Sequence, residues 1–324
     1  MSVFTPLSHK EIADFVSRFD VGEFIGAQGV SGGSENTNYF VDCGAGSYVL
    51  TLVERGPRAD LPFFIELLDC LHHADLPVPY AITDRDGVAL HTLKGKPALL
   101  QPKLSGEHVD QVNATQCAAL GDMLARLHLS ACSLARTSDR GPSWTVNTAL
   151  SLMSGPWKEH QSWLEPALLH LREWLENSGD DAPAQTLPTT IIHGDLFRDN
   201  VLFQGNTISG VIDFYNAASG WILFDVAVCV NDWCVDAADP VYTLNTERAR
   251  ALLGAYLDQR PFSTAEQHDW PRMLQLAALR FWVSRQQYAL EHKGQSGILI
   301  KDPTYFYRVM KMHVLNPEMA SGLL

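Results

Sequence analysis

The residues whose types and spacing suit chemistry gather in one stretch, IIHGDLFRDNVLFQGNTISGVIDFY, from Ile191 to Tyr215. It contains a His-x-Asp-x-x-x-x-Asn pattern, formed by His193, Asp195 and Asn200, and then Asp213. Mg²⁺ prefers such hard oxygen donors and usually takes one or two protein carboxylates besides phosphate oxygens. A further carboxylate can orient a hydroxyl that attacks a γ-phosphate. The stretch therefore predicts a magnesium-nucleotide site, although Asp and Asn are also ordinary turn residues.

Short apolar runs surround these polar residues and must position them. Residues 191–192 predict a strand that leads into a polar loop, and residues 201–203 and 210–212 predict a hairpin turning at 204–206. The second acid then stands at the exit of the hairpin. Carboxylates at the ends of short buried strands are well placed to share one metal ion.

These motifs resemble the catalytic and metal-binding loops of the aminoglycoside phosphotransferase and choline kinase superfamily. The resemblance implies an α+β, bilobal protein-kinase-like fold, with a small antiparallel-sheet N-lobe and a larger, mainly helical C-lobe. It implies ATP as cosubstrate and Mg²⁺ as cofactor. It also implies that Asp195 is the catalytic Asp, that Asn200 and Asp213 bind metal, and that His193 and Asp225 support the catalytic loop.

The order of elements agrees with two unequal lobes, which we expect at residues 1–102 and 103–324. Strands are expected at 40–43, 48–53 and 97–102, with a helix after Asp60, whereas the remainder is mostly helical. A helix capped by Asn113 precedes a poorly patterned segment at 133–160, which we expect to be irregular. Further helices are expected at 162–176, 222–235 and 247–258, and a capping box of Thr264 and Gln267 predicts a long helix that continues past Arg285.

Composition excludes several classes of function. The chain has 324 residues and a net charge of −13, which disfavours binding to nucleic acid or to anionic membranes. The N-terminus lacks a secretory pattern and no apolar run approaches the length of a membrane span, so we expect a cytoplasmic protein. Its six cysteines are scattered without a CxxC pair, and we expect free buried thiols. The sequence does not indicate an oligomeric state.

The nucleotide-binding residues are expected in the N-lobe. A glycine-containing loop before the strand at 40–43 matches the phosphate-covering loop of the superfamily, and the strand before the hinge adds a further candidate; together they give Gly33, Ser34, Asn36, Asn38 and Gln101. One departure stands out, because Thr51 occupies the place where kinases of this class usually carry a Lys. Replacement cations are sought among Arg55, Arg58, Lys96 and Lys103.

Arg198 is the cation closest in sequence to the catalytic Asp. Many protein kinases carry a Lys two residues after that Asp, but here the position is Phe197. We hypothesise that Arg198 neutralises charge on the transferring phosphoryl group, because cations aimed at developing charge are a large catalytic term. The alternative is a structural pairing with Asp199 or Asp225.

A longer resemblance concerns the acceptor. Segments spread over most of the chain, among them GSENTNYF (33–40), GKPALLQPKLSG (95–106) and IDFYNAASGW (212–221), resemble bacterial homoserine kinases, and the resemblance includes Thr51. It implies transfer of the γ-phosphoryl of MgATP to the side-chain hydroxyl of L-homoserine. That zwitterion needs a cation for its carboxylate and an acid for its ammonium, for which Arg280 or Arg285 and Asp232 are candidates.

Three alternatives remain open at this point. The first is a kinase of the same fold for choline, methylthioribose or an aminoglycoside. The second, suggested by Thr51, is a nucleotide-binding scaffold without catalysis. The third is a metal-dependent hydrolase, for which one acid-bearing hairpin supplies few ligands.

Overall fold

The computed structural model describes residues 4–30, 36–54, 56, 58–130, 134–138, 140–180, 182–238, 241–293 and 301–323. The chain forms two compact units. The smaller comprises Met1–Gly106 with Ser209–Ile212, and the larger comprises Glu107–Ile208 with Asp213–Leu324. The lobe boundary expected after residue 102 stays a prediction.

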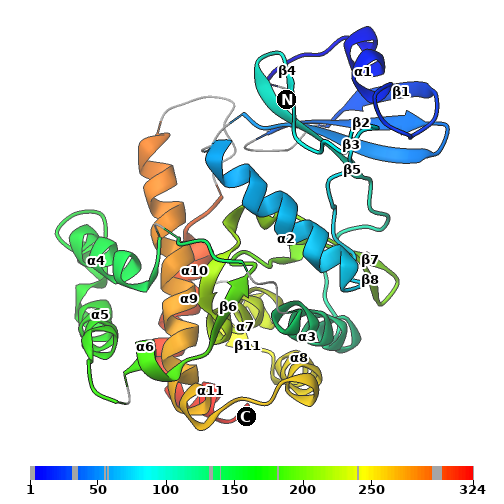
Figure 1. Ribbon diagram of the computed structural model, residues 1–324. Coiled ribbons are helices and arrows are strands. Elements are labelled where there is room, and N and C mark those ends of the chain that lie inside the picture. Colours follow the sequence, from blue (N-terminus) through cyan, green and yellow to red (C-terminus); the bar gives the residue numbers. More distant parts are fainter. Residues whose placement is uncertain are drawn as a thin grey trace. The chain divides into compact units, whose positions relative to one another are not determined.

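The smaller unit is built on an antiparallel sheet of five strands in the order β1-β2-β3-β5-β4 (Figure 1). These strands are β1 (Phe24–Gly29), β2 (Thr37–Cys43), β3 (Gly46–Leu52), β4 (His91–Leu93) and β5 (Lys96–Pro102). The strands expected at 40–43, 48–53 and 97–102 are thus confirmed as β2, β3 and β5.

Burial of one sheet face explains why this sequence forms strands. Along β2 the side chains of Tyr39, Val41 and Cys43 alternate with more exposed neighbours, as period-two patterning requires. Helix α1 (His9–Val16) adds Ile12 and Phe15 to the same core. Helix α2 (Leu61–His73) begins where expected, with Pro62 in its first turn, and buries Phe64, Leu67, Leu68 and Leu71.

The larger unit is mainly helical. Its helices are α3 (Ala114–Leu129), α4 (Pro142–Leu152), α5 (Gln161–Glu176), α6 (Pro183–Thr186), α7 (Ile222–Trp233), α8 (Thr246–Gln259), α9 (Thr264–Glu291), α10 (Thr304–Leu315) and α11 (Pro317–Ser321). The long helix α9 packs against α4, α7 and α10 (Figure 1). The expected helices at 162–176, 222–235 and 247–258 are confirmed as α5, α7 and α8.

A side-chain cap and a glycine determine where α3 begins and how closely it packs against α8. Helix α3 begins after Asn113, whose side chain accepts a hydrogen bond from the Gln116 main-chain N–H at 2.9 Å, so the expected cap is confirmed. Helices α3 and α8 approach so closely that a Cβ at Gly121 would lie 2.1 Å from the carbonyl oxygen of Leu252. A side chain at Gly121 would therefore force the two helices apart.

Two expectations about the helices were wrong. The segment 133–160 contains α4, which buries Val146 and Ala149 and contacts α9, so tertiary packing overrides its weak helical pattern. The capping box of α9 consists of Ser263 and Glu266 instead of Thr264 and Gln267. Ser263 has extended backbone angles, and its hydroxyl accepts from the Glu266 N–H while the Glu266 carboxylate accepts from the Ser263 N–H.

Short strands of the chain bring the chemically interesting loops together. Strand β6 (Thr189–Ile192) pairs with β9 (Ala218–Trp221), and β7 (Val201–Gln204) forms the expected hairpin with β8 (Thr207–Val211). A further pair, β10 (Val235–Ala238) and β11 (Val241–Leu244), follows α7. The strand and hairpin expected around the motif residues are therefore confirmed.

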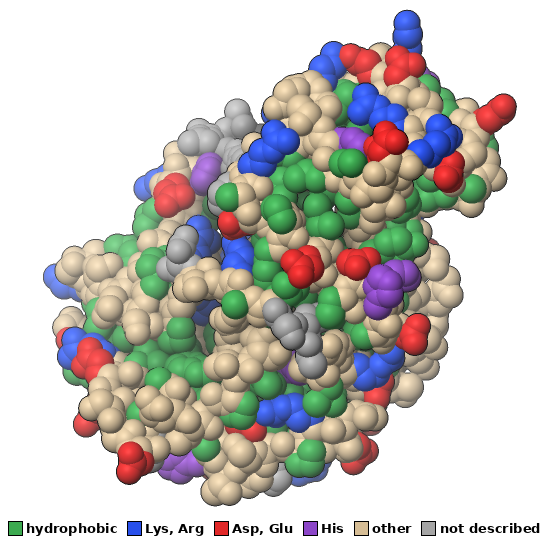
Figure 2. Space-filling model, in the orientation of Figure 1, with side chains coloured by type: hydrophobic (Ala, Val, Ile, Leu, Met, Phe, Trp, Pro, Cys, Tyr) green, Lys and Arg blue, Asp and Glu red, His purple; other side chains and the backbone are tan. Residues whose placement is uncertain are grey.

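The cysteines and the surface charges complete the description. Cys43, Cys117, Cys229 and Cys234 are free and buried, as expected, but Cys70 is disulfide-bonded, against expectation. On the face drawn in Figure 2, acidic and basic side chains are intermixed. In the described part of the chain, no helix has the length and apolar character needed to cross a membrane.

Candidate active site

The loop of residues 193–200 follows β6, and the buried carboxylate of Asp225 binds its backbone. Asp225 of α7 is fully buried, and its two oxygens accept hydrogen bonds from the main-chain N–H groups of His193 and Gly194, both at 2.8 Å. Its Oδ2 also lies 3.2 Å from Nε2 of His128, whose Nδ1 lies 2.9 Å from the Tyr256 hydroxyl. Burial alone would raise the pKa of Asp225, but the His128 hydrogen bond and charge hold it below its usual value. The loop is thus anchored through its backbone.

Two positions of the site require unusual backbone geometry. Gly194 has φ +75°, and a Cβ there would lie 3.0 Å from the carbonyl oxygen of Asn216. Asp213 has left-handed angles, φ 64° and ψ 59°, immediately after β8. Non-glycine residues seldom adopt this region, and Asp is one of the few that enter it at modest cost. Such outliers often mark functional sites.

Asp195 is half-buried among polar groups of the loop. Its main-chain N–H lies 3.3 Å from Nδ1 of His193, and Nδ2 of Asn216 donates to its Oδ2 at 3.3 Å. Burial, followed by the negative charge of Asp213, raises the pKa of Asp195 to about 8. A carboxylate with so high a pKa in a polar site is typical of a functional acid or base.

Asn200 and Asp213 have the donor atoms that a magnesium ion needs. Nδ2 of Asn200 donates to the main-chain oxygen of Asp195 at 2.8 Å, so the amide oxygen is the atom left to bind a cation. Asp213 keeps contact with solvent, yet the surrounding protein raises its pKa, with a further contribution from the charge of Asp199. A cation beside Asp213 would relieve the repulsion between its carboxylate and that of Asp195, so the donor set fits Mg²⁺.

The fit depends on oxygens from a ligand as well. Within the described ranges, no group of three or more His, Cys, Asp or Glu side chains is arranged to hold a metal ion. One carboxylate and one amide therefore suit a metal that arrives with phosphate oxygens. They do not suit a metal cage made wholly of protein side chains.

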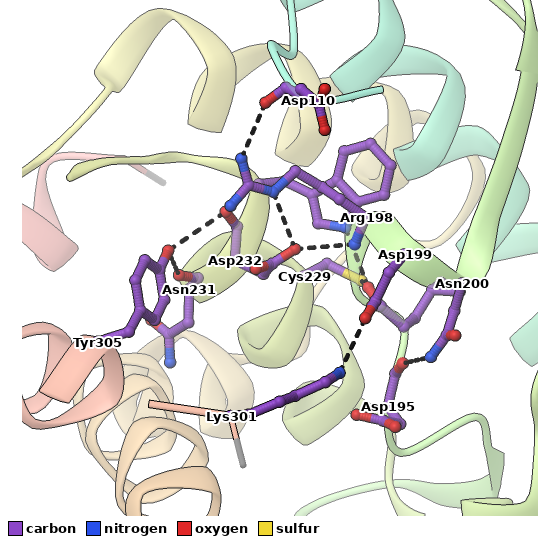
Figure 3. Close-up of polar contacts among 12 residues, drawn as sticks. Asp110, Asp195, Arg198, Asp199, Asn200, Cys229, Asn231, Asp232, Lys301 and Tyr305 are labelled. Atoms are coloured by element: carbon purple, nitrogen blue, oxygen red, sulfur yellow. Dashed lines mark hydrogen bonds and ion pairs between the residues drawn. The ribbon is translucent and has the colours of Figure 1, made fainter. Parts of the chain in front are cut away.

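Arg198 is bound to Asp232 instead of the partners that the sequence suggested. Its main-chain N–H donates to Asp232 Oδ2 at 2.8 Å, and its Nε lies 3.2 Å from the same oxygen (Figure 3). Nη1 reaches the main-chain oxygen of Asp110 at 3.4 Å. Lys301 pairs with Asp199 at 2.8 Å. The neighbouring loop residues Arg198 and Asp199 are therefore each bound to a residue from a later part of the chain.

Two arginines of α9 lie near the same loop. Arg280 donates from Nε to the main-chain oxygen of Arg140 at 3.2 Å and from Nη1 to Ser284 Oγ. Burial and the charge of Arg140 lower its pKa to about 10, while Asp195 acts in the opposite direction. Arg285 donates to the main-chain oxygen of Asp302 and lies over the Phe306 ring.

The expected nucleotide-binding residues that are described lie in the smaller unit. Asn38 Oδ1 accepts from the hydroxyl of buried Thr51 at 2.8 Å, and Asn36 Oδ1 accepts from the Glu54 N–H at 3.1 Å. Gln101 donates to the main-chain oxygen of Pro79. Gly33 and Ser34 lie outside the described residues.

Three of the four cations sought in place of a Lys at Thr51 are described. Lys96 on β5 forms an ion pair with Glu54, which follows β3, and Glu54 accepts a second hydrogen bond from Thr37 at 2.6 Å. Arg58 donates to Thr92, and Lys103 lies over the Phe40 ring. Among the three described replacement cations, Lys96 is the one with a carboxylate partner; Arg55 lies outside the described residues.

Sequence reasoning missed several residues that support the site. They contact the loop itself or the residues of α7 that hold it, and they are His128, Asn216, Tyr256, Lys301 and Tyr305. Asn216 alone carried a local signal, since it lies three residues after Asp213 in the same polar turn. The others become neighbours of the loop through the fold.

Comparison with known proteins gives the family of this chain. The sequence model of the phosphotransferase enzyme family matches residues 26–273. The chain belongs to this phosphotransferase family. Two curated relatives support the assignment over nearly their full lengths. A homoserine kinase of Pseudomonas aeruginosa (strain UCBPP-PA14) is 48% identical over 308 residues, 94% of each chain.

The second relative is a homoserine kinase of Methylobacillus flagellatus, 39% identical over 320 residues, which are 98% of this phosphotransferase and 97% of the relative. Among solved structures, a spectinomycin phosphotransferase in complex with ADP and spectinomycin superposes with a TM-score of 0.72. It is 12% identical, and the match covers 99% of this chain and 100% of that one. The predicted kinase-like fold class is therefore confirmed, and the family implies ATP as cosubstrate.

Proposed function

We propose that this phosphotransferase is a homoserine kinase that transfers the γ-phosphoryl of MgATP to the side-chain hydroxyl of L-homoserine. The observation that carries the proposal is the arrangement of Asp195, Asn200 and Asp213 on one loop and one hairpin exit, in a chain 48% identical to a homoserine kinase along nearly its whole length. Because the reaction consumes ATP, we place the enzyme in the cytoplasm.

The metal-binding roles follow from the donor atoms. Asn200 would offer its amide oxygen and Asp213 its carboxylate to Mg²⁺, which bridges phosphate oxygens and offsets their charge when bound. The Nδ2 hydrogen bond to the Asp195 carbonyl keeps the Asn200 amide from rotating its nitrogen toward the metal. The left-handed backbone at Asp213 turns the chain directly after β8.

Asp195 would orient the acceptor hydroxyl and take its proton late in the transfer. The raised pKa of this carboxylate, about 8, suits a group that must accept a proton and release it again. A loose transition state asks little of a strong base, so orientation is the larger part of its work. His193 and Asp225 would act through the loop backbone, since Asp225 binds the two N–H groups that precede Asp195.

The candidates for binding phosphate, acceptor and nucleotide differ in how far their contacts support these roles. Arg198 would offset charge on the transferring phosphoryl group, but its bonds to Asp232 and Asp110 also give it a clear structural role. Asp232 would have to share its carboxylate between Arg198 and an acceptor ammonium. In the smaller unit, Asn36, Asn38 and Gln101 remain candidates for nucleotide contact, together with Gly33 and Ser34, and Lys96 is our candidate for the replacement cation.

The test is ADP release measured with L-homoserine, choline, methylthioribose, L-serine and L-threonine. We expect kcat/KM for L-homoserine to exceed that for each other acceptor. Asp195→Asn should abolish transfer while MgATP still binds, which separates a catalytic loss from a binding loss. ADP release that depends on choline or methylthioribose, and not on L-homoserine, would show a kinase of the same fold with another acceptor. No acceptor-dependent release at all would favour the scaffold.

A further inference from the structure

Two arginines from different elements of the larger unit lie against one tryptophan. The guanidinium carbon of Arg280, on α9, lies 5.4 Å from the centre of the Trp144 ring, and that of Arg140, which precedes α4, lies 5.8 Å from the same centre. The Arg280 Nε–H also donates to the Arg140 carbonyl oxygen at 3.2 Å. The backbone of one arginine therefore fixes the guanidinium of the other.

Like charges brought this close repel, and nothing in the described residues offsets them directly. Neither Arg140 nor Arg280 forms an ion pair with a carboxylate of the described ranges, and the Arg280 hydrogen bonds go to a carbonyl and a hydroxyl. The charge of Arg140 is one of the causes that lower the Arg280 pKa. A half-buried guanidinium beside an exposed one, with no ion-pair partner among the described residues, is an unfavourable arrangement that a bound anion would stabilise.

The other cations near the catalytic loop are already engaged. Arg198 is bound to Asp232 and Lys301 to Asp199. Arg285 donates to the main-chain oxygen of Asp302 and lies 4.5 Å from the centre of the Phe306 ring. Arg140 and Arg280 differ from it because two guanidinium groups meet on one ring. We therefore take Arg140 and Arg280 as the pair for an incoming anion.

Ring contacts locate Arg280 relative to the loop that carries Asp195. The guanidinium carbon of Arg280 lies 5.6 Å from the centre of the Phe281 ring, and that ring packs against the Phe197 ring with centres 4.5 Å apart. Phe197 is two residues after Asp195, so Arg280 stands on the part of α9 that faces the loop. An acceptor whose hydroxyl contacts Asp195 can therefore place a negative group at Arg280. Trp144 adds an apolar ring face beside both guanidinium groups, which suits the methylenes of a short aliphatic acceptor.

We propose that Arg140 and Arg280, seated on Trp144, bind the α-carboxylate of the amino-acid acceptor and make that carboxylate a requirement for recognition. This rests on the proposed function, and it makes Arg280 the carboxylate partner in preference to Arg285. Arg280 supplies the fixed, half-buried guanidinium, and exposed Arg140 supplies a second donor that can close over the ligand.

The experiment compares two ligands that differ in the carboxylate. L-2-aminobutyrate keeps the ammonium and carboxylate of L-homoserine without its hydroxyl, and 3-aminopropan-1-ol keeps the ammonium and hydroxyl without the carboxylate. Both are measured as competitive inhibitors of L-homoserine phosphorylation. The enzymes are wild type, Arg280→Gln, Arg140→Gln and the control Arg272→Gln, whose guanidinium on the same helix is held by Asp269 and His170.

We expect Arg280→Gln and Arg140→Gln each to raise KM for L-homoserine and the inhibition constant of L-2-aminobutyrate by about 10- to 100-fold. This is the usual range for losing a hydrogen bond to a charged group. The inhibition constant of 3-aminopropan-1-ol should change far less, so the ratio of the two constants shifts. Arg272→Gln should leave the ratio where it is in the wild type. Arg140 is exposed, so its variant decides the matter if Arg280→Gln does not fold.

Three results would overturn the proposal. Equal weakening of both inhibitors would mean that the arginines support the fold of the pocket and do not contact the carboxylate. A rise in KM for ATP as large as that for L-homoserine would mean that they bind nucleotide phosphate. A wild-type enzyme that turns over another acceptor and not L-homoserine would refute the proposed function itself, which this design detects before any variant is made.

Discussion

Asn200 donates from Nδ2 to the main-chain oxygen of Asp195 at 2.8 Å, so the predicted metal ligand and the predicted catalytic residue are joined through the loop backbone. The amide thereby has one end fixed to the loop and one end available to a cation. An aspartate at the same place would supply oxygens at both ends. The choice of Asn at this position follows from the need for a donor and an acceptor in one side chain.

Replacing Asn200 should separate these two roles. Asn200→Ala removes both ends and should weaken Mg²⁺ dependence by about 10- to 100-fold or more, a typical loss when an interaction at a metal site is removed. Asn200→Asp keeps an oxygen for the metal but replaces the amide donor with a carboxylate oxygen, which repels the Asp195 carbonyl oxygen. We expect this variant to lose turnover while it keeps part of its affinity for Mg²⁺. Titration of ADP release with Mg²⁺ measures both. Equal and full activity of the two variants would remove Asn200 from the metal site.

Asp195→Asn should abolish phosphoryl transfer and, at alkaline pH, stabilise the protein. The folded-state pKa of about 8 lies above the usual value of about 3.9 for a free Asp. Between these values the folded state binds the proton more strongly, so the stability contribution of Asp195 falls as pH rises and is lost above pH 8. The neutral amide avoids that loss. Thermal unfolding at pH 5 and pH 9 should therefore show a higher Tm for the variant at pH 9, and at pH 5 the difference should shrink.

Binding of Mg²⁺ should release protons from Asp195. A cation next to Asp213 lowers the Asp195 pKa from about 8, so at pH 7.5 a protonated carboxyl becomes ionised. Calorimetric titration with MgATP in two buffers of different ionisation enthalpy counts the released protons. Asp195→Asn is the matched control and should release fewer. The same proton count for both proteins would mean that Asp195 is already ionised before the metal arrives.

Asp225 should be the most sensitive position for stability. Removing a fully buried carboxylate that accepts three hydrogen bonds should cost about 3–5 kcal/mol in Asp225→Ala. Its folded-state pKa is below the ordinary value, so this contribution is present above about pH 4 and is lost as pH falls through the folded-state pKa. Urea unfolding at pH 7 and pH 3.5 measures both effects. A variant within 1 kcal/mol of wild type at pH 7 would contradict the anchoring role.

The bond between Arg198 and Asp232 allows a test of the two roles of Arg198. A double-mutant cycle uses Arg198→Ala, Asp232→Ala and the double variant, with stability and kcat measured for each. If Arg198 acts on the phosphoryl group, Arg198→Ala should lower kcat by about 100-fold or more, well beyond the effect of Asp232→Ala. A purely structural pair would give equal losses in both single variants and no further loss in the double variant.

The parts of the fold that depend on interactions between residues close in the sequence could be predicted from it. The hairpin around residues 204–206, the strand before His193 and the cap at Asn113 depend on neighbours within a few residues, and all three were found. Helix α4 was missed because its stability comes from packing on α9, which a weak pattern does not reveal. The capping box of α9 was misplaced by one residue, since Ser263 and Thr264 are both good caps and only backbone geometry distinguishes them.

The site follows the same division. The motif residues could be proposed because they follow one another at short, fixed spacings in the sequence. His128 and Tyr256 support the loop through Asp225, and Lys301 contacts Asp199, all from segments far away in the chain. The true partner of Arg198 was missed for the same reason, since Asp232 lies on α7 and comes close through the turn of the chain after β9. Guanidinium groups without a carboxylate partner among the described residues, such as those of Arg140 and Arg280, can be recognised once the neighbours are known.

The left-handed backbone of Asp213 restricts which mutations this protein can accumulate at its proposed metal-binding position. Val, Ile and Thr are excluded by steric strain at Cβ, whatever the charge of the site. Gly and Asn enter the region readily but carry no negative charge. Substitutions of Asp213 by β-branched residues should therefore be lost during evolution. Random mutagenesis should recover functional replacements at position 213 far less often than at position 200.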